Sequence, residues 1–345
     1  MKSGFVAILG RPNAGKSTLL NALTGEKVAI VTPKPQTTRN RIAGVVEVPA
    51  RKGVHPAAQI VFVDTPGVHK PASQLDRRML QEVHEALETR DLVLVLIDAT
   101  RRIQLEAAGE PAGAHQHRSS NWASEEEFLF GLIRGLDCPV FLVLTKIDLV
   151  AKDLLLPLIE TLTKQFNFAE VIPVSARKRD GLDVLVRKIV GVLPTGERFY
   201  PKDQYTDQPM RFMVAELIRE RILVETGEEV PYAAAVVIER YEEAEPPAPP
   251  RKKGPPPRLP LTRIAAAIYC ERDGQKAILI GKGGAKLKEI GTGARKQIES
   301  LLGTRVYLEL HVIVEPGWRE SRAFIESLDW RSQLERLAEK QGNEP

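Results

Sequence analysis

Apolar runs of strand length alternate with helix-like stretches through the first part of the chain. The apolar runs are short and rich in Val, Ile, Leu and Phe, and the stretches between them repeat apolar residues at helical spacing. This alternation predicts an α/β domain whose mainly parallel sheet carries helices on both faces. The expected strands are residues 5–9, 41–48, 59–63, 92–97, 140–144 and 170–174, and the expected helices are residues 17–24, 75–88, 124–136, 152–166 and 182–193.

The last third of the chain follows a different pattern, which predicts a second, α+β domain. A linker is expected at residues 199–208, so the expected domains are residues 1–198 and 209–345. The tail places Trp318, Phe324 and Trp330 at near-helical spacing, which favours a packed terminal helix over a surface that binds a partner. The expected elements are a helix at 210–225, strands at 232–238 and 262–270, a helix that includes 276–280, a helix carrying apolar residues from 287 to 301, and a strand at 305–314.

Composition agrees with two globular domains. The chain has 345 residues, of which 43% are hydrophobic and 27% are charged, and it has two cysteines, Cys138 and Cys270. The cysteines are expected to be buried thiols of a reducing compartment. A first strand that begins almost at Met1 leaves no room for a signal peptide, and no apolar run reaches the length of a bilayer span. A cytoplasmic location is therefore expected.

Positive charge is concentrated in the second domain. The net charge is +4, but residues 251–310 carry thirteen Lys or Arg against five Asp or Glu. A basic module suggests a polyanionic partner. Charge alone leaves open the alternative of a solvated basic face without a partner.

The turn after the first expected strand carries the most informative motif. Residues 10–17 read Gly-Arg-Pro-Asn-Ala-Gly-Lys-Ser, which is G-x-x-x-x-G-K-[ST] between a strand and a helix. Backbone N–H groups and the helix dipole then converge on phosphates. Lys16 is expected to reach the β- and γ-phosphates, and Ser17 to ligate Mg²⁺. The residues of this loop expected to contact the nucleotide are Asn13, Ala14, Gly15, Lys16, Ser17 and Thr18.

Two further segments are expected to complete the phosphate and metal site. Asp64, Thr65, Pro66 and Gly67 follow the strand at 59–63, where a carboxylate can hold Mg²⁺ and the Gly67 N–H can meet the γ-phosphate. The polar loop 36–39 offers Thr38, favoured over its neighbour, as a ligand that engages only when the γ-phosphate is present. The predicted metal ligands are Ser17, Thr38 and Asp64, and the groups expected to serve hydrolysis are Lys16, Thr38 and Gly67.

Two segments at later strand ends predict that the base is guanine. Residues 145–148 read Thr-Lys-Ile-Asp, and Asp148 can accept hydrogen bonds from the guanine N1–H and its exocyclic amine, which adenine cannot supply. The backbone of the segment after the last strand can cap the guanine oxygen. The predicted base-side residues are Thr145, Lys146, Asp148, Ser175, Ala176 and Arg177, and the predicted ligands are GTP and GDP.

The second domain contains a G-x-x-G turn between two helices. The order helix, strand, strand, helix, G-x-x-G, helix, strand is that of a KH domain, whose turn clamps the backbone of about four single-stranded nucleotides. Together with the basic charge, it predicts RNA binding. The expected contacts are Ile280, Gly281, Lys282, Gly283, Gly284 and Lys286.

These motifs resemble those of translation-factor-like P-loop GTPases, and nearly the whole chain resembles the Era family of bacterial GTPases, which end in a type II KH domain. The resemblance implies a GTP-hydrolysing switch that uses Mg²⁺, binds ribosomal RNA near the 3′ end of the small subunit and assists assembly of the small ribosomal subunit. It also implies some peripheral contact with the inner face of the cell membrane. An RNA-binding factor with little nucleotide dependence, or a signalling GTPase at a membrane surface, remain alternatives.

Several positions depart from that family or from better-known GTPases. The family usually has Asn where this chain has Thr145; threonine keeps a hydroxyl but lacks the amide, which puts the tethering of the loop and the nucleotide affinity in question. Segments 50–57, 103–121 and 242–261 look like additions. Val68 stands where Ras-type proteins have a water-orienting glutamine. Era-like GTPases share this replacement of the glutamine by an apolar residue. Asn13 matches the P-loop asparagine that in relatives helps to hold K⁺, although a simple turn residue fits equally well.

Overall fold

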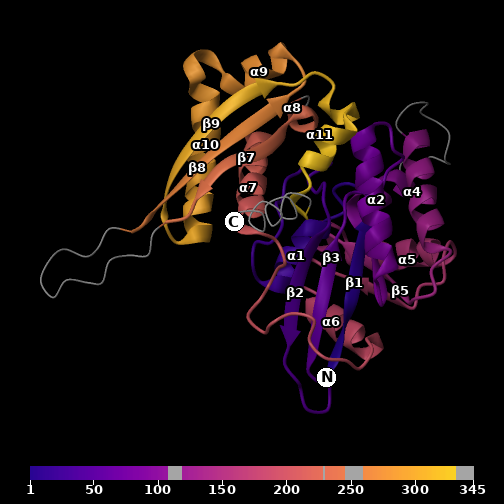
Figure 1. Ribbon diagram of the computed structural model, residues 1–345. Helices are drawn as coiled ribbons and strands as arrows, with labels where there is room; N and C mark the ends of the chain where they lie inside the picture. The colour runs from indigo at the N-terminus through magenta and orange to yellow at the C-terminus, as the bar shows by residue number, and fades with distance from the viewer. Residues whose placement is uncertain (108–118, 228–229, 245–258, 332–345) are drawn as a thin grey trace, which may run out of the picture. The chain divides into compact units, whose positions relative to one another are not determined.

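The computed structural model describes residues 1–107, 119–227, 230–244 and 259–331 (Figure 1). The chain divides into two compact units, the first formed by residues 1–72 and 76–207 and the second chiefly by residues from Gln208 onward. No helix in the described ranges is long and apolar enough to cross a bilayer. Cys138 is half-buried, Cys270 is buried, and both are free thiols.

The first unit is built on a six-stranded sheet, which confirms the predicted α/β architecture. The strand order is β2-β3-β1-β4-β5-β6, and every neighbouring pair is parallel except β2 with β3. Parallel strands end at one edge of a sheet, so the loops that follow β1, β3, β4 and β5 gather there. The strands are β1 (Lys2–Gly10), β2 (Ile42–Val48), β3 (Ala58–Asp64), β4 (Leu92–Asp98), β5 (Val140–Thr145) and β6 (Glu170–Pro173).

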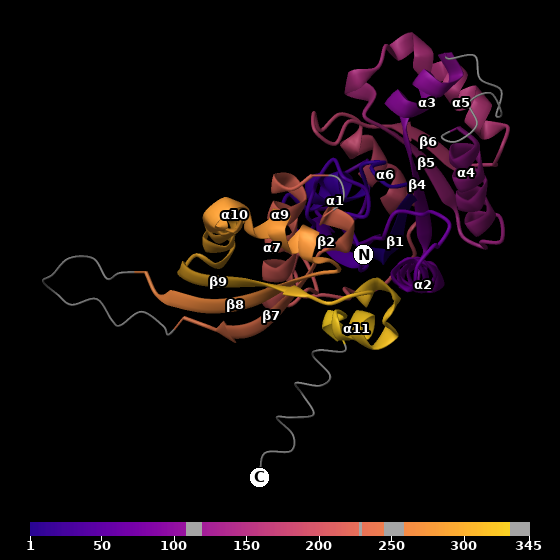
Figure 2. The ribbon, with the colours of Figure 1, turned by 90° about the horizontal axis from the view of Figure 1, so that it is seen from above.

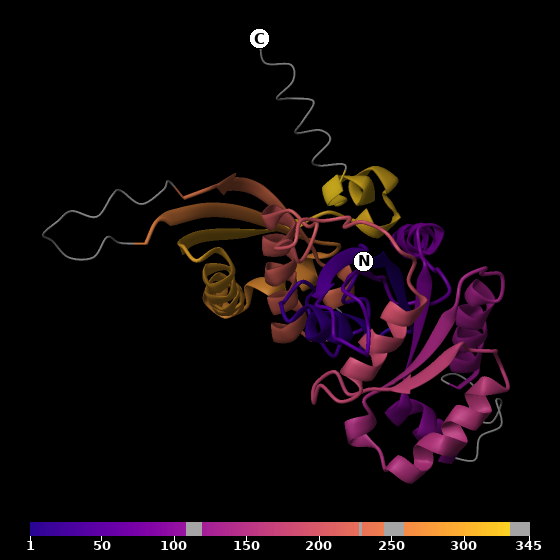
Figure 3. The same ribbon diagram turned by 90° about the horizontal axis from the view of Figure 1, so that it is seen from below.

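Helices cover both faces of this sheet, because successive strand residues point to opposite sides. Ile8 of β1 packs into a core with α1 and α6, whereas the adjacent Leu9 packs into a second core with α2, α4 and α5. Figures 2 and 3 show the helices on the two sides. The helices are α1 (Lys16–Thr24), α2 (Gln74–Glu88), α3 (Ala99–Ala107), α4 (Ser119–Ile133), α5 (Leu155–Thr163) and α6 (Leu182–Val192).

Three segments of the first unit differ from the prediction or were left without a predicted structure. Helix α3 was not predicted and overlaps the proposed addition 103–121, of which residues 108–118 lie outside the described ranges. Residues 50–57 form the loop between β2 and β3, with a backbone bridge between Arg51 and His55. Residues expected as linker lie along β2, where the Val45 N–H donates to the Tyr205 carbonyl at 2.9 Å. This segment is therefore held against the sheet.

The second unit has a three-stranded sheet with helices on one face (Figure 2). Strand β8 pairs antiparallel with β7 and parallel with β9, and α7, α9 and α10 pack on it. The order α-β-β-α-α-β is that of the predicted KH domain. The elements are α7 (Met210–Glu225), α8 (Val230–Ala233), β7 (Ala235–Glu242), β8 (Leu261–Cys270), α9 (Asp273–Ile280), α10 (Ala285–Leu302), β9 (Arg305–Val314) and α11 (Arg322–Ser327).

Two predictions for the second unit need correction. The strand expected from residue 232 begins at Ala235, because the preceding residues form the short helix α8. The described part of the tail, up to residue 331, forms a short turn at Trp318–Glu320 and the short helix α11 in place of one longer helix, although it is packed as expected. Trp318 is fully buried and its indole N–H donates to the Ala233 carbonyl at 2.8 Å, and Trp330 packs against Phe212. The tail thus completes the core, and residues 332–345 lie outside the described ranges.

Candidate nucleotide site and nucleic-acid interface

The loop between β1 and α1 curls around the side chain of Lys16. Asn13 and Gly15 have positive φ angles of 65° and 93°, which bend the backbone toward the first turn of α1. The Lys16 ammonium donates to the carbonyls of Gly10 and Arg11, each at 3.1 Å. Burial lowers the pKa of Lys16 to about 8, although the nearby Asp64 carboxylate opposes this. A buried ammonium held in a loop of backbone amides is a setting that favours a polyanion.

The three predicted metal ligands meet beside Lys16. Ser17 Oγ donates to Asp64 Oδ2 at 2.7 Å, Thr38 Oγ1 donates to the same oxygen at 3.2 Å, and the two hydroxyl oxygens lie 2.9 Å apart. Asp64 is fully buried, which raises its pKa, while Lys16 and the two hydroxyls lower it. Its second oxygen, Oδ1, is buried without a hydrogen-bond partner among the described residues. Two hydroxyls and a carboxylate are a donor set that fits Mg²⁺.

Gly67 lies directly against the phosphate loop. A Cβ atom at this position would lie 2.9 Å from the backbone N and Cα of Pro12, so a larger residue would push the two loops apart. The next residue, Val68, donates its N–H to the Gly10 carbonyl at 3.0 Å and buries its side chain in the core. Val68 therefore cannot orient water. Thr65 fixes the start of this loop, because its hydroxyl donates to the Ile8 carbonyl at 2.8 Å.

An open cavity of about 400 Å³ lies above these groups. Nine of the predicted site residues line it: Asn13, Gly15, Lys16, Ser17, Thr18, Thr38, Gly67, Lys146 and Arg177. Asp64 and Thr145 are buried and are not among the lining residues. One wall, residues 30–33, was not predicted. Asn13 reaches this wall, because its amide nitrogen donates to the Pro33 carbonyl at 2.8 Å.

Thr145 ties the phosphate loop to the sheet through its hydroxyl. Thr145 Oγ1 lies 2.7 Å from the carbonyl of Ala14 and 3.2 Å from that of Ile97. The contact that the missing amide put in question is thus made by a shorter side chain. Lys146, in a left-handed conformation, forms an ion pair of 2.6 Å with Asp98 at the end of β4. Asp98 was not predicted, because a single carboxylate at a strand end carries no motif.

The remaining base-side residues surround the same edge of the sheet. Asp148 is exposed on a short turn after β5, where its carboxylate is accessible to a ligand. Ser175 is buried, exchanges two backbone hydrogen bonds with Asp180 and accepts one on its hydroxyl from the Lys178 N–H. Ala176 follows it, half-buried, in the loop that leads to Arg177.

The G-x-x-G turn of the second unit has the backbone that glycine permits. Gly281, Gly283 and Gly284 have φ angles of 70°, 57° and 80°. A Cβ atom on Gly281 would also lie 2.9 Å from the Lys286 backbone nitrogen. Lys282 is exposed at the tip, whereas Lys286 forms a 2.7 Å ion pair with Glu289 that raises the pKa of the lysine. Ile280 is half-buried and joins the turn to the core.

Comparison with known proteins decides the family. The profile of a 50S ribosome-binding GTPase family matches residues 5–146, and that of the KH domain matches residues 257–319. GTPase Era of Lacticaseibacillus paracasei is 42% identical over 330 residues, which cover 96% of this chain and 97% of that protein. The chain belongs to the Era family of GTPases. Era of Geobacter metallireducens is also 42% identical, over 95% of this chain and 98% of its own length.

Two solved Era structures match the whole fold. One is an Era variant of Aquifex aeolicus bound to GDP and aluminium fluoride, with a TM-score of 0.78. The other is Era in complex with MgGDPNP and nucleotides 1506–1542 of 16S ribosomal RNA, with a TM-score of 0.80. Each is 38% identical to this chain and covers 96% of it and 99% of its own length.

Proposed function

We propose that this member of the Era family is a GTP-hydrolysing switch that binds single-stranded RNA near the 3′ end of the small-subunit ribosomal RNA and assists assembly of the small ribosomal subunit. The observation that carries the proposal is the convergence of Ser17, Thr38 and Asp64 beneath the cavity, in a chain that also has a G-x-x-G turn. The similarity to Era bound to MgGDPNP and 16S ribosomal RNA supports it.

The side chains at the cavity divide the work of binding and hydrolysis. Ser17, Thr38 and Asp64 would hold Mg²⁺, which when bound neutralises charge on the β- and γ-phosphate oxygens. Lys16 binds the same phosphates through its ammonium, and the Gly67 N–H meets the γ-phosphate. Thr38 joins the set only when the γ-phosphate is present, so that the loop carrying it distinguishes GTP from GDP. Because Val68 is buried and apolar, the attacking water must be oriented by other groups.

Base recognition rests on the residues after β5 and β6. Asp148 accepts from the guanine N1–H and amine, Thr145 fixes the phosphate loop from below, and Lys146 lines the base side. The backbone of Ser175, Ala176 and Arg177 caps the guanine oxygen. Ala14 and Thr18 complete the phosphate contacts, and Thr65 and Pro66 position Gly67.

Asn13 offers a place for a K⁺ ion. Its amide nitrogen is engaged by the Pro33 carbonyl, which leaves the amide oxygen as the atom that would ligate the ion. An added cation would stabilise the charge that develops during hydrolysis. We expect hydrolysis to be about tenfold faster in K⁺ than in Na⁺, and Asn13→Ala to remove the difference. Equal rates of the unaltered protein in the two salts would contradict a role for the ion.

The exposed turn of the KH domain predicts a charge effect on RNA binding. Lys282→Glu should weaken binding of a single-stranded RNA by about tenfold at moderate salt and reduce the salt dependence by about one unit of slope, because one phosphate contact is lost. Lys288→Glu, on the exposed side of α10, is the matched control and should have a much smaller effect. Equal losses for the two variants would indicate a general field effect and no clamp at the turn.

The GTPase rate with and without small ribosomal subunits tests the proposed function directly. A rate that rises with subunits supports it, and a rate that does not change with subunits counts against a role in assembly.

We also propose a cytoplasmic location with peripheral contact at the inner face of the cell membrane. The basic residues 251–253 that would meet anionic lipid lie outside the described ranges. Sedimentation with anionic vesicles, with RNA as competitor, tests that contact.

A further inference from the structure

Helix α2 holds the loop that carries Thr38 at points on both sides of that residue. On one side, the Gln36 side-chain amide donates to Asp76 Oδ1 at 3.1 Å. On the other side, the Arg41 backbone N–H donates to Glu82 Oε2, also at 3.1 Å. The predicted metal ligand therefore lies between two anchors that belong to the same helix. The two acids are not part of any motif that predicted the nucleotide site.

Asp76 also binds the segment that carries Gly67. Its Oδ1 lies 3.1 Å from His69 Nε2, and its Oδ2 accepts from the Ala72 N–H at 3.1 Å. The other ring nitrogen, His69 Nδ1, lies 2.9 Å from the Gly67 carbonyl. A carbonyl and a carboxylate both accept hydrogen bonds, so this pair of partners favours the protonated imidazole, in which both ring nitrogens donate. The raised pKa of His69, caused mainly by its hydrogen bond to Asp76 and opposed by burial, agrees with this.

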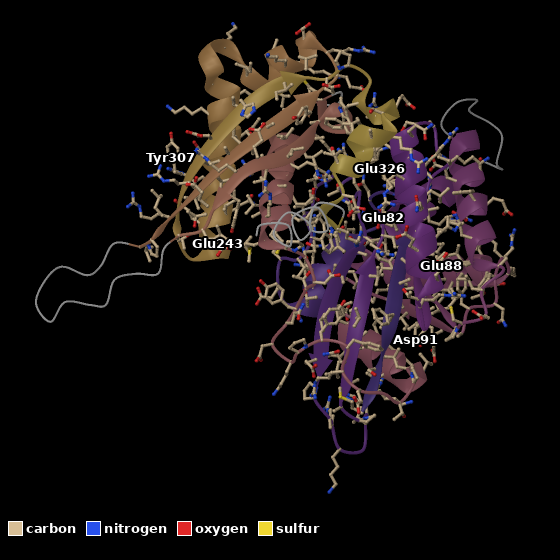
Figure 4. The ribbon with its side chains drawn as sticks, in the orientation of Figure 1. Glu82, Glu88, Asp91, Glu243, Tyr307 and Glu326 are labelled. Carbon is tan, nitrogen blue, oxygen red and sulfur yellow. The ribbon has the colours of Figure 1, made fainter. Side chains whose placement is uncertain are left out.

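Glu82 is a fully buried carboxylate whose charge is matched by two arginines. Arg78, one turn earlier on α2, lies 2.7 Å from it, and the Arg41 guanidinium lies 3.6 Å from it. Arg41 is also held by Glu85 at 3.0 Å. Figure 4 shows Glu82 on α2, with Glu88 further along the same helix. A buried charge is stable only when it is paired, so this contact fixes the end of the loop at Arg41.

We propose that Asp76 and Glu82 are positioning residues that couple the Thr38 loop and the Gly67 loop to α2. Neither acid lines the cavity. Asp76 joins the two loops to each other, and Glu82 fixes the far end of the Thr38 loop, so a movement of either loop is passed to the helix. The inference rests on the proposed roles of Thr38 and Gly67 at the γ-phosphate. Its consequence is that loss of either anchor should weaken the triphosphate complex much more than the diphosphate complex.

The test uses variants of nearly unchanged shape. In the full-length protein, Asp76→Asn and Glu82→Gln remove the charge, and Glu88→Gln alters an exposed acid at the end of the same helix as a matched control. The measurement is the Mg²⁺ concentration at half-maximal binding of a non-hydrolysable GTP analogue, and separately of GDP, by fluorescence. We expect Asp76→Asn and Glu82→Gln to raise the Mg²⁺ concentration needed to bind the analogue by about tenfold, and the concentration needed to bind GDP by less than about twofold. Glu88→Gln should change neither.

A second pair of variants isolates the contact from any effect on folding. Gln36→Ala removes the bond from the loop side and leaves α2 and the contacts of Asp76 with His69 and Ala72 intact. It should therefore act in the same direction as Asp76→Asn but more weakly, and the double variant should be no worse than Asp76→Asn alone. If Glu82→Gln does not fold, this pair decides the question. Additive effects of the pair, or equal weakening of the analogue and of GDP, would overturn the coupling and indicate a packing role.

Ser17→Ala separates this inference from the proposed function. Ser17 is a predicted ligand in both nucleotide states, so its loss should raise the Mg²⁺ requirement for the analogue and for GDP alike. If Ser17→Ala leaves both unchanged, the assignment of the metal site fails. If Ser17→Ala acts as expected and the variants at Asp76, Glu82 and Gln36 behave as the unaltered protein, only the coupling fails.

Discussion

Replacement of Asp148 by Asn is expected to exchange guanine for xanthine as the preferred base. An Asn side chain keeps one acceptor and adds a donor, so it cannot accept from both the N1–H and the amine of guanine, but it can donate to the second carbonyl of xanthine. A site built to bond a group discriminates strongly when the partner is missing, so we expect GTP affinity to fall by roughly a hundredfold or more. Xanthosine triphosphate should then compete successfully for the cavity.

Competition binding of GTP, ATP and xanthosine triphosphate measures this exchange. Asp153→Asn is the matched control, because Asp153 is an exposed acid on the adjacent turn. The control should retain preference for GTP. If Asp148→Asn also retained full preference for GTP, the base would have to be read by other residues.

Replacement of Lys16 by Met is expected to abolish most hydrolysis while leaving the fold intact. The methionine has a similar length but no charge, so the phosphates lose their buried ammonium, and we expect the turnover rate to fall by about 10²–10³-fold. Burial lowers the pKa of Lys16 to about 8, so burying the ammonium has a cost that methionine does not have. Removing the ammonium also takes away the cation beside the buried Asp64 carboxylate, which opposes that gain. The unfolding temperature should therefore change little.

Single-turnover hydrolysis and thermal unfolding, measured together, check the Lys16 prediction. Lys52→Met, in the exposed loop between β2 and β3, removes a surface charge and should leave the rate unchanged. A Lys16→Met protein that hydrolyses GTP at the rate of the Lys52→Met control would contradict the assigned role. A lost rate that accompanies a much lower unfolding temperature would instead indicate a folding defect.

The sequence predicted the parts of the site that lie at strand ends. Asp64 and Thr145 are the last residues of β3 and β5, and Ser17 lies in the first turn of α1, just after β1. Parallel strands bring their ends to one edge of the sheet, so motifs distant in sequence meet there. Thr38 was harder to place because it lies in a loop without regular structure, yet the structure puts its hydroxyl 2.9 Å from that of Ser17. Spacing and strand order therefore determine which groups converge.

The residues that sequence analysis missed act through pairing between segments. Asp98, Asp76 and His69 each make a contact that depends on which side chain a folded neighbour presents. A single acid or histidine on an element has no spacing signature, so its partner is found only in three dimensions. The same reason explains α8, whose Ala233 carbonyl accepts from Trp318 far along the chain. An apolar alternation at residues 232–238 favoured a strand, and tertiary contacts overrode it.

The affinity of the full-length protein for a single-stranded RNA from the 3′ end of the small-subunit ribosomal RNA, measured with a GTP analogue, with GDP and without nucleotide, tests the account most directly. A nucleotide-dependent switch requires that the analogue change RNA affinity relative to GDP, by about 5–150-fold for an ordinary coupling energy, and that the RNA change the affinity for the analogue by the same factor. Equal RNA affinities in the three states would contradict the switch and indicate an RNA-binding factor whose GTPase domain does not change its affinity for RNA.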